Sequence, residues 1–461
     1  MMDFDTIAAI ATALGEASVG VVRISGPLAG NITAKIVQTP SGRDVSLTSQ
    51  RQVLYGQIVH PKSGQQIDEG LVLWMPGPKS YTAEDVVELQ VHGGVQLVGA
   101  VLEAALAAGA RMAEPGEFTK RAFLNGRIDL SQAEAVIDLI RAKTAFAGRL
   151  ALQQVQGRFR DEVRSIRKAL IHLQAHVEVT IDYPEHDVED VACRQVMETG
   201  AQLVGRIDAL RESAEMGRIL REGVATAIVG KPNVGKSSLL NAILHSDRAI
   251  VTDIPGTTRD VLEEYVNVHG IPLKLVDTAG IRETEDVVEK IGVDKSRQTI
   301  RDAELALVVL DGSLAPTDED VEIVASTGDV RRIFVVNKVD KGLHPACEDW
   351  LREWDAAGVV HISAKEHMNL TALEDKIAET VRTNLLTERD STYMTNARQK
   401  HLLDLAKTDL LAAMNAASAG ATLDLIAVAL QSGYEQLGFV IGEETGEDLL
   451  DEIFSQFCLG K

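Results

Sequence analysis

The sequence predicts a three-part fold: an α+β domain, then an all-α helical domain in two stretches, with an α/β domain inserted between those stretches. Residues 1–125 alternate short apolar runs with glycines and prolines, whereas residues 126–217 have helical apolar spacing and a single proline. Residues 218–380 contain short apolar runs that end at turn residues, and helical spacing returns over residues 381–461. The periodicity of the apolar residues therefore changes three times along the chain. These changes place domain boundaries near residues 125, 217 and 380.

The N-terminal stretch alternates expected strands with turns. Apolar runs occupy residues 19–24, 71–75 and 86–91; Ser25-Gly26-Pro27 follows the first and Gly93-Gly94 follows the last. Short apolar runs bounded by such residues are typical of strands. We therefore expect an α+β domain here.

From about residue 130 the apolar residues recur at helical intervals. Ser131, with Glu134 three residues later, predicts a capping box at the start of a helix. The apolar stripe of that helix consists of Ala135, Val136, Leu139 and Ile140. A similar stripe near the C-terminus consists of Leu402, Leu403, Leu405, Leu410 and Leu411. One helical domain built from both stretches is the most economical interpretation.

Four apolar runs in the middle of the chain alternate with helical segments. They cover residues 225–229, 273–276, 305–310 and 333–336. Short apolar runs of this kind are typical of buried strands in a parallel sheet with helices on both faces. The ligand of such a sheet binds at the carboxyl ends of the strands.

The chain is acidic along its whole length. Its net charge is −22, and acidic residues outnumber basic ones in each of the four stretches. Because this charge repels polyanions, an RNA ligand would need a local basic patch or a partner protein.

The composition also favours a cytoplasmic protein. No apolar run approaches the roughly 20 residues that span a bilayer, and residues 1–14 contain no basic residue, unlike a leader peptide. Cys193, Cys347 and Cys458 are far apart and form no C-x-x-C pair. We therefore expect no membrane span, disulfide framework or thiolate zinc site.

Residues 230–237 read Gly-Lys-Pro-Asn-Val-Gly-Lys-Ser and directly follow an expected strand. In this G-x-x-x-x-G-K-S pattern the glycines let backbone N–H groups close around phosphates. Lys236 then reaches the β- and γ-phosphate oxygens, and Ser237 ligates Mg²⁺. The predicted nucleotide contacts here are Asn233, Val234, Gly235, Lys236, Ser237 and Ser238.

Three further motifs follow in order. Asp277-Thr278-Ala279-Gly280 ends an expected strand, where Asp277 can support the Mg²⁺ shell and the Gly280 N–H can meet the γ-phosphate. Asn337-Lys338-Val339-Asp340 ends another strand, and a carboxylate there accepts hydrogen bonds from N1–H and the 2-amino group of guanine. Adenine would leave that carboxylate unpaired. Ser363-Ala364-Lys365 offers a backbone group to the guanine O6. Together these motifs predict a Ras-like P-loop domain that binds and hydrolyses GTP.

The residues expected to assist hydrolysis differ from the Ras pattern. Ile281 stands where Ras-like enzymes place a glutamine that orients the attacking water. An aliphatic side chain cannot hold a water, so another group must do so. Glu289 and Glu283 are the nearby carboxylates, and either can act directly or through a bridging water.

The loop at residues 252–260 offers oxygens for cations. Thr258 is the predicted second Mg²⁺ ligand, while Thr252, Thr257, the Ile254 carbonyl and the Asn233 side chain can hold a monovalent ion. An ion against the phosphates would stabilise developing charge as an arginine finger does, and Arg259 is the competing candidate. The predicted GTP contacts of this loop and the following motif are Thr252, Asp253, Ile254, Pro255, Gly256, Thr257, Thr258, Asp277, Thr278, Ala279 and Gly280.

Motifs outside this domain resemble those of the MnmE (TrmE) family of tRNA modification GTPases. They are the segments at residues 21–27, 81–85, 115–126 and 181–185, and the C-x-G-K terminus at residues 458–461. The resemblance covers essentially the whole chain. The one departure noted is Val234, where members of the family often have Ala, and it should leave the phosphate cradle intact.

The resemblance implies a tetrahydrofolate-binding and dimerisation domain, a discontinuous helical domain and a G domain. It implies a homodimer whose G domains approach each other in the presence of K⁺. It also implies a heterotetramer with the FAD-dependent protein MnmG. That complex would install an aminomethyl or carboxymethylaminomethyl group on C5 of the tRNA wobble uridine, with 5-formyl- or methylene-tetrahydrofolate donating the one-carbon unit.

The resemblance also assigns roles to individual residues. The potassium ligands would be Asn233, Thr252, Ile254 and Thr257; the magnesium ligands Ser237 and Thr258; the catalytic carboxylate Glu289; and the folate contacts Arg23, Glu84, Arg127 and Lys461. Cys458 is a further catalytic candidate whose chemistry the sequence leaves open, since Gly460 and Lys461 exclude a prenylation box.

Two other functions remain open at this stage. One is a GTP-switched binding protein such as a ribosome-assembly factor, for which a basic RNA-binding module would be expected. The other is a folate-dependent methyltransferase with a regulatory G domain, which would bind the same two ligands.

Overall fold

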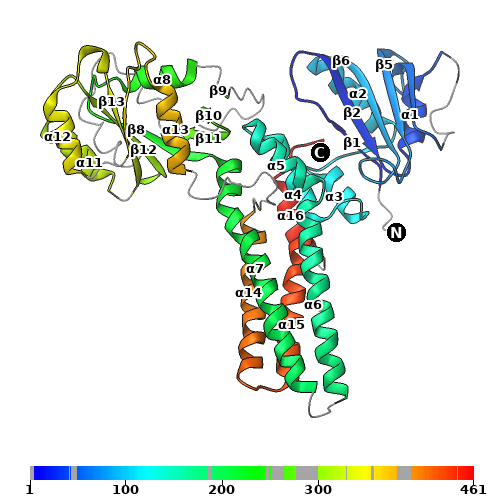
Figure 1. Ribbon diagram of the computed structural model, residues 1–461. Coiled ribbons are helices and arrows are strands. Elements are labelled where there is room, and N and C mark those ends of the chain that lie inside the picture. The colour runs from blue at the N-terminus through cyan, green and yellow to red at the C-terminus, as the bar shows by residue number, and fades with distance from the viewer. Residues whose placement is uncertain are drawn as a thin grey trace.

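The computed structural model describes residues 5–40, 42, 49–183, 188–245, 249–250, 264–276, 300–328, 330–354, 358–381, 394, 396–443 and 445–460. It confirms the three-part fold. A helical stem carries the N-terminal α+β part and the inserted α/β part at the same end (Figure 1).

The N-terminal part is built on a seven-stranded sheet in the order β3-β4-β5-β6-β2-β1-β7. Its strands are β1 (Ile7–Ile10), β2 (Ala17–Ser25), β3 (Val37–Gln38), β4 (Gln52–Val59), β5 (Gln66–Met75), β6 (Val86–Gly93) and β7 (Arg111–Met112). Helices α1 (Ala29–Ile36) and α2 (Val95–Ala107) pack against one face, where Val22, Ile24 and Leu89 are fully buried. Strand alternation sends the intervening residues to the other face. There, α3 (Glu117–Leu124) places Phe118 against Ile7 and Ala9 of β1.

The two helical stretches form one core, as expected. The helices are α4 (Leu130–Arg141), α5 (Ala145–Val155), α6 (Arg158–Asp182), α7 (Val188–Glu222), α14 (Ala397–Ser418), α15 (Leu423–Ile441) and α16 (Glu447–Ser455). Leu170 of α6, Ile207 of α7, Leu410 of α14 and Leu430 of α15 share one buried cluster. The stem is therefore a four-helix bundle whose chain leaves for the inserted part after α7 and returns at α14 (Figure 1).

The predicted start of α4 is wrong by two residues. Asp129, not Ser131, is the N-cap, and it forms a capping box with Gln132. Gln132 lies three residues after Asp129, and its side chain accepts a hydrogen bond from the Asp129 backbone N–H. The Asp129 carboxylate is also a better acceptor at a helix N-terminus than the Ser131 hydroxyl. Glu134 is instead buried in the stem, where it accepts hydrogen bonds from Arg398 and Gln399 at the start of α14.

The inserted part contains a second seven-stranded sheet in the order β14-β13-β12-β8-β11-β10-β9. Its strands are β8 (Val224–Val229), β9 (Ala249–Ile250), β10 (Glu264–Val268), β11 (Ile271–Leu275), β12 (Leu305–Asp311), β13 (Arg331–Asn337) and β14 (Val359–His361). The strands β11, β8, β12, β13 and β14 are mutually parallel, and β10 and β9 add an antiparallel edge. All four expected strands are confirmed, and their carboxyl ends lie at one edge of the sheet.

Helices cover both faces of this sheet (Figure 1). They include α8 (Lys236–His245), α11 (Asp318–Ser326), α12 (Pro345–Glu353) and α13 (Leu370–Val381). Two buried clusters reflect this layering, one containing Leu240 and Ile377 and the other Val324 and Leu351. Within the part of the chain that the structure describes, no helix is long and apolar enough to cross a membrane.

Candidate active site

The P-loop follows β8 at the edge where the parallel strands end. Gly230 and Gly235 have φ values of 152° and 102°, which favour glycine. A Cβ on Gly230 would lie 2.4 Å from the Val309 carbonyl oxygen, and one on Gly235 would lie 2.2 Å from the Asn337 amide nitrogen. Both glycines are therefore required by close approach as well as by backbone conformation.

Lys236 begins α8 and folds back over the loop. Its Nζ donates to the carbonyl oxygens of Gly230 at 2.7 Å and Lys231 at 2.8 Å. Burial lowers the pKa of this ammonium group. These two hydrogen bonds place the ammonium group inside the loop, next to the helix N-terminus. This arrangement binds phosphate oxygens. Ser237 and Ser238 lie exposed in the first turn of α8.

Asn337 ties the guanine-side motifs to the P-loop. Its side chain is buried, donates to the Val234 carbonyl at 2.9 Å and accepts from the Ala364 N–H at 3.0 Å. Three segments far apart in sequence are thereby held in one arrangement, and the absence of a Cβ at Gly235 leaves room for the Asn337 amide.

Lys338 and Asp340 complete the guanine side. Lys338 Nζ donates to the Asn233 carbonyl at 2.5 Å and to Asp311 at 2.7 Å. Asp340 is exposed and accepts a hydrogen bond from the buried Ser363 hydroxyl at 2.6 Å. That hydroxyl lowers the pKa of the Asp340 carboxyl, which keeps the group ionised and able to accept two hydrogen bonds from guanine. The side chain of Lys365 is largely exposed.

Two residues of this site were not predicted from the sequence. Asp311, the last residue of β12, holds Lys338; although burial acts in the opposite direction, hydrogen bonds from Lys338 and Ser313 lower the pKa of its carboxyl. The buried Asp320 pairs with Lys231 of the P-loop at 2.6 Å. Asp311 was detectable because it directly follows the apolar run at residues 305–310, at the edge where ligands bind. Nothing in the local sequence indicates the Lys231 pair.

Several predicted residues lie outside the described part of the chain. They are the cation-loop residues Thr252, Asp253, Ile254, Pro255, Gly256, Thr257, Thr258 and Arg259; the motif Asp277, Thr278, Ala279 and Gly280; Ile281, Glu283, Glu289; and the C-terminal Lys461. The described ends of β10 and β11 fix where these segments attach to the sheet.

A second cluster lies on the outer face of the N-terminal sheet. Arg23 of β2 forms an ion pair with Glu88 at 2.8 Å. The guanidinium carbons of Arg23 and Arg127 lie 5.4 and 5.1 Å from the centroid of the Tyr81 ring. Arg127 also donates to the Tyr81 carbonyl oxygen at 2.7 Å. The two predicted arginines, 104 positions apart, are therefore brought onto one aromatic ring.

Glu84 lies on the same loop as Tyr81 and is held from two sides. Its carboxylate accepts from the Ser25 hydroxyl at 2.7 Å and from Arg121 at 3.2 Å. Arg121, which the sequence reading missed as a site residue, is almost fully buried and also binds Asp5 and Glu117. Glu84 is thus fixed in position from two sides, and it shares Arg121 with Asp5 and Glu117.

The C-terminal tail joins this cluster. Arg23 donates to the Gly460 carbonyl at 3.2 Å, and the Gly116 N–H meets the Cys458 carbonyl at 3.5 Å. Gly460 has a φ of 89°, and a Cβ there would lie 2.2 Å from the Ile10 carbonyl oxygen. The tail therefore docks on the N-terminal sheet and leaves Cys458 exposed beside it.

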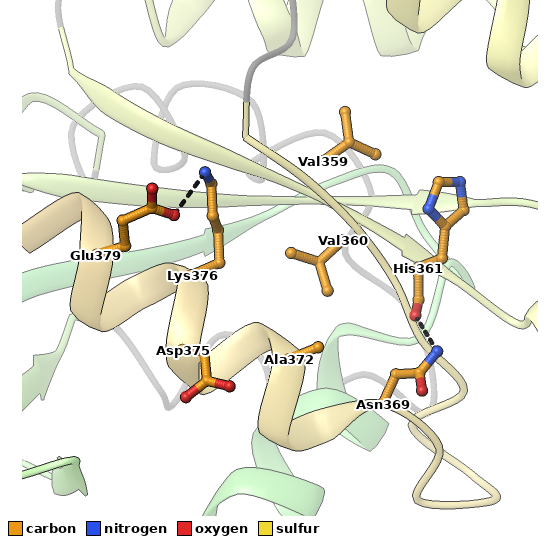
Figure 2. A pocket seen from close by; sticks show the side chains of 8 residues that line it. All are labelled: Val359, Val360, His361, Asn369, Ala372, Asp375, Lys376 and Glu379. Carbon is orange, nitrogen blue, oxygen red and sulfur yellow. Dashed lines mark hydrogen bonds and ion pairs between the residues drawn. The ribbon is translucent and has the colours of Figure 1, made fainter.

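A separate hollow lies along the edge of the inserted sheet. Figure 2 shows it between β14 and α13, with an ion pair between Lys376 and Glu379 at 2.8 Å on one wall. It is lined by Val359, Val360, His361, Asn369, Ala372, Asp375, Lys376 and Glu379. Its lining contains none of the P-loop or guanine-side residues, so it is not the nucleotide site.

The fold and the nucleotide site define the class. A P-loop at the end of β8, with the Asn337–Asp340 and Ser363–Lys365 segments bonded to it, makes the chain a P-loop GTPase, an enzyme that hydrolyses GTP. Comparison with known proteins supplies the family. The model for "GTP-binding protein TrmE N-terminus" matches residues 6–127, and the model for "MnmE helical domain" matches residues 130–458.

The chain belongs to the MnmE family of tRNA modification GTPases. It is 50% identical to the tRNA modification GTPase MnmE of Geobacillus kaustophilus over 465 residues, covering 100% of both chains. It is 46% identical to the Enterococcus faecalis protein of the same name, covering 100% of this chain and 99% of that one. The G domain of the T. maritima FeoB iron transporter is a more distant match, with 22% identity over 34% of this chain and a TM-score of 0.25.

Proposed function

We propose that this chain hydrolyses GTP in the modification of tRNA wobble uridine. In this proposal it acts with FAD-dependent MnmG and adds an aminomethyl or carboxymethylaminomethyl group at uridine C5, using a folate one-carbon unit. The observation that carries the proposal beyond GTP hydrolysis is the convergence of Arg23, Glu84 and Arg127 with the C-terminal tail.

The chemistry of this cluster fits a folate. A pteridine ring offers a donor–acceptor edge that the fixed Glu84 carboxylate can read, and its flat face suits an aromatic and guanidinium surface. The anionic glutamate tail of a folate suits Arg23, Arg127 and Lys461. Bound there, the folate would supply a one-carbon unit, and the chain's own residues would orient it beside Cys458.

The homodimer is part of the proposal. On the outer face of the N-terminal sheet, Val53, Tyr55 and Leu71 are 64%, 49% and 42% exposed. Tyr55 of β4 lies directly opposite Leu71 of β5, so these side chains form one apolar patch. Adjacent exposed apolar side chains mark an interaction surface. A second copy of the chain is the proposed occupant.

The assignment of domains and ions completes the proposal. Residues 1–125 would bind folate and dimerise, residues 126–217 and 381–461 would form the helical domain, and residues 218–380 the G domain, in a cytoplasmic protein. Ser237 and Thr258 would hold Mg²⁺, and Asn233, Thr252, Ile254 and Thr257 would hold K⁺. Asn233 is exposed on the P-loop, so its side-chain oxygen is accessible to a cation next to the phosphates.

GTP turnover is expected to be faster in K⁺ than in Na⁺, by roughly tenfold or more at equal ionic strength. A K⁺ ion beside the phosphates would stabilise charge that develops in hydrolysis, and the smaller Na⁺ would not fill the same set of oxygens. Phosphate release by the full-length protein in KCl and in NaCl measures the ratio. Equal rates in the two salts would remove the cation from the proposal.

Glu289→Ala provides the companion measurement in KCl. This variant should retain GTP affinity and lose most turnover, whereas Glu283→Ala should turn over like the unmodified chain. The opposite pattern would transfer the water-positioning role to Glu283.

A further inference from the structure

The hairpin formed by β10 and β11 lies between two segments that carry predicted GTP-site residues. Val268 pairs with Ile271 across a two-residue turn of His269 and Gly270, whose φ values of 49° and 90° fit a type I′ turn. Residues 251–263 lead into β10, and residues 277–299 follow β11. These two stretches carry the predicted cation-loop residues, Asp277 and Glu289. The hairpin is therefore covalently joined to both segments expected to contact the γ-phosphate side of GTP.

Residues at the start of α5, in the helical stem, contact this hairpin. The Thr144 hydroxyl donates to the Gly270 carbonyl at 2.9 Å. Lys143 Nζ lies 4.8 Å from the centroid of the Tyr265 ring in β10. A Cβ on Gly270 would lie 3.3 Å from Phe146 Cβ, so the α5 side chain packs directly on the turn. Figure 1 shows α5 beside this edge of the sheet.

The contact continues into the core. Ala147 and Leu150 of α5 belong to the same buried cluster as Val266, Val268 and Ile271 of the hairpin. Thr144 itself is only 6% exposed. Because the interface is packed and its polar group is bonded, a shift of the hairpin relative to α5 would break this packing and the Thr144 hydrogen bond.

Helix α7 provides a second attachment of the inserted part to the stem, and its Met216, Ile219 and Leu220 belong to the same buried cluster as the hairpin. Helix α7 runs directly into β8 through Gly223, and Arg218 of α7 pairs with Glu304, next to β12, at 2.8 Å. The Thr144 contact is therefore not needed to hold the sheet on the stem. It bears specifically on the hairpin.

We propose that Thr144 is a positioning residue for GTP hydrolysis: through Gly270 it fixes the β10–β11 hairpin and couples the nucleotide state to helix α5. The proposal needs only the GTP hydrolysis shared by the family and is independent of folate and potassium. Its failure would leave the proposed modification chemistry untouched.

Two substitutions at Thr144 separate this contact from helix capping. Thr144 is also the N-cap of α5, where its Oγ1 accepts from the Ala147 N–H at 3.1 Å. Thr144→Ser keeps both the cap and the donor. Thr144→Asp keeps a good cap but has no donor for the Gly270 carbonyl and faces that oxygen with a charge.

Thr144→Asp should lower kcat for GTP roughly 3- to 10-fold with little change in KM, and Thr144→Ser should match the unmodified chain. A role in stability alone would move the melting temperature without this split between kcat and KM. Wild-type turnover by a folded Thr144→Asp protein would overturn the proposal. Lys143→Met, which removes the contact with Tyr265 and leaves the cap intact, should lower kcat in the same direction by a smaller factor.

Hydrogen exchange provides the direct readout of coupling. In the full-length protein, amides of α5 should exchange at different rates with GDP and with a non-hydrolysable GTP analogue. Thr144→Asp should abolish that difference in α5 and preserve it in the hairpin. Equal exchange of α5 in both nucleotide states of the unmodified chain would overturn the proposal.

Discussion

Replacing Asp340 with Asn is expected to lower GTP affinity by roughly 100-fold or more and to create affinity for xanthosine triphosphate. The carboxylate accepts from both N1–H and the 2-amino group of guanine, whereas an amide sets a donor against one of them. Xanthine has a carbonyl in place of that amino group and accepts from the amide. Competition of the two triphosphates against a fluorescent guanine nucleotide measures the exchange of specificity.

Two companion variants make this result specific. Ser363→Ala removes the hydroxyl that orients Asp340 at 2.6 Å and should weaken GTP binding by a smaller factor. Asp349→Asn changes an exposed carboxylate that pairs only with Arg352 among the ion pairs of the described residues, and it should bind GTP normally. Undiminished GTP affinity of Asp340→Asn would show that another group reads the base.

Arg23→Ala is expected to weaken binding of 5-formyltetrahydrofolate by roughly 10- to 100-fold, because a hydrogen bond to a charged partner contributes about 1.5–3 kcal/mol. The side chain is 12% exposed and touches both the Tyr81 ring and the C-terminal tail. Its loss therefore removes a cation and loosens the tail. Calorimetric titration of the folate into each protein gives the two dissociation constants.

The control for this variant uses the other half of the same ion pair. Glu88→Gln breaks the 2.8 Å pair with Arg23 and leaves the guanidinium in place. It should retain folate binding, and circular dichroism should show both variants folded. Wild-type affinity in Arg23→Ala would remove this arginine from the folate site, and equal loss in both variants would make the effect one of structure.

Much of the fold could be predicted because its signals are local. The parallel strands of the inserted sheet are mostly apolar, and β8 and β13 end at the turn residue Gly230 and at Asn337. Their existence and the edge that binds ligand therefore both follow from the sequence pattern. The N-cap of α4 was misplaced because Asp129 and Ser131 both offer a capping pattern. Only tertiary packing, which buries Glu134 against Arg398, separates the two.

The residues that were missed act through long-range contacts. Arg121 fixes Glu84 across 37 positions, and Thr144 reaches Gly270 across 126. No local pattern indicates such pairs, since an arginine in α3 or a threonine at a helix start has an ordinary explanation in its own element. The guanine-side motif could be predicted from the sequence, whereas the hydrogen bond from Lys338 to Asp311 is visible only in the structure.

The most direct test of the proposed function is nucleoside analysis of tRNA from cells that lack this protein. The wobble uridines of the affected tRNAs should lose their C5 aminomethyl-type substituents. The unmodified chain should restore them, and Asp340→Asn should fail to do so in cells that are not supplied with xanthosine triphosphate. Wobble uridines with identical substituents in the presence and absence of the protein would contradict the account.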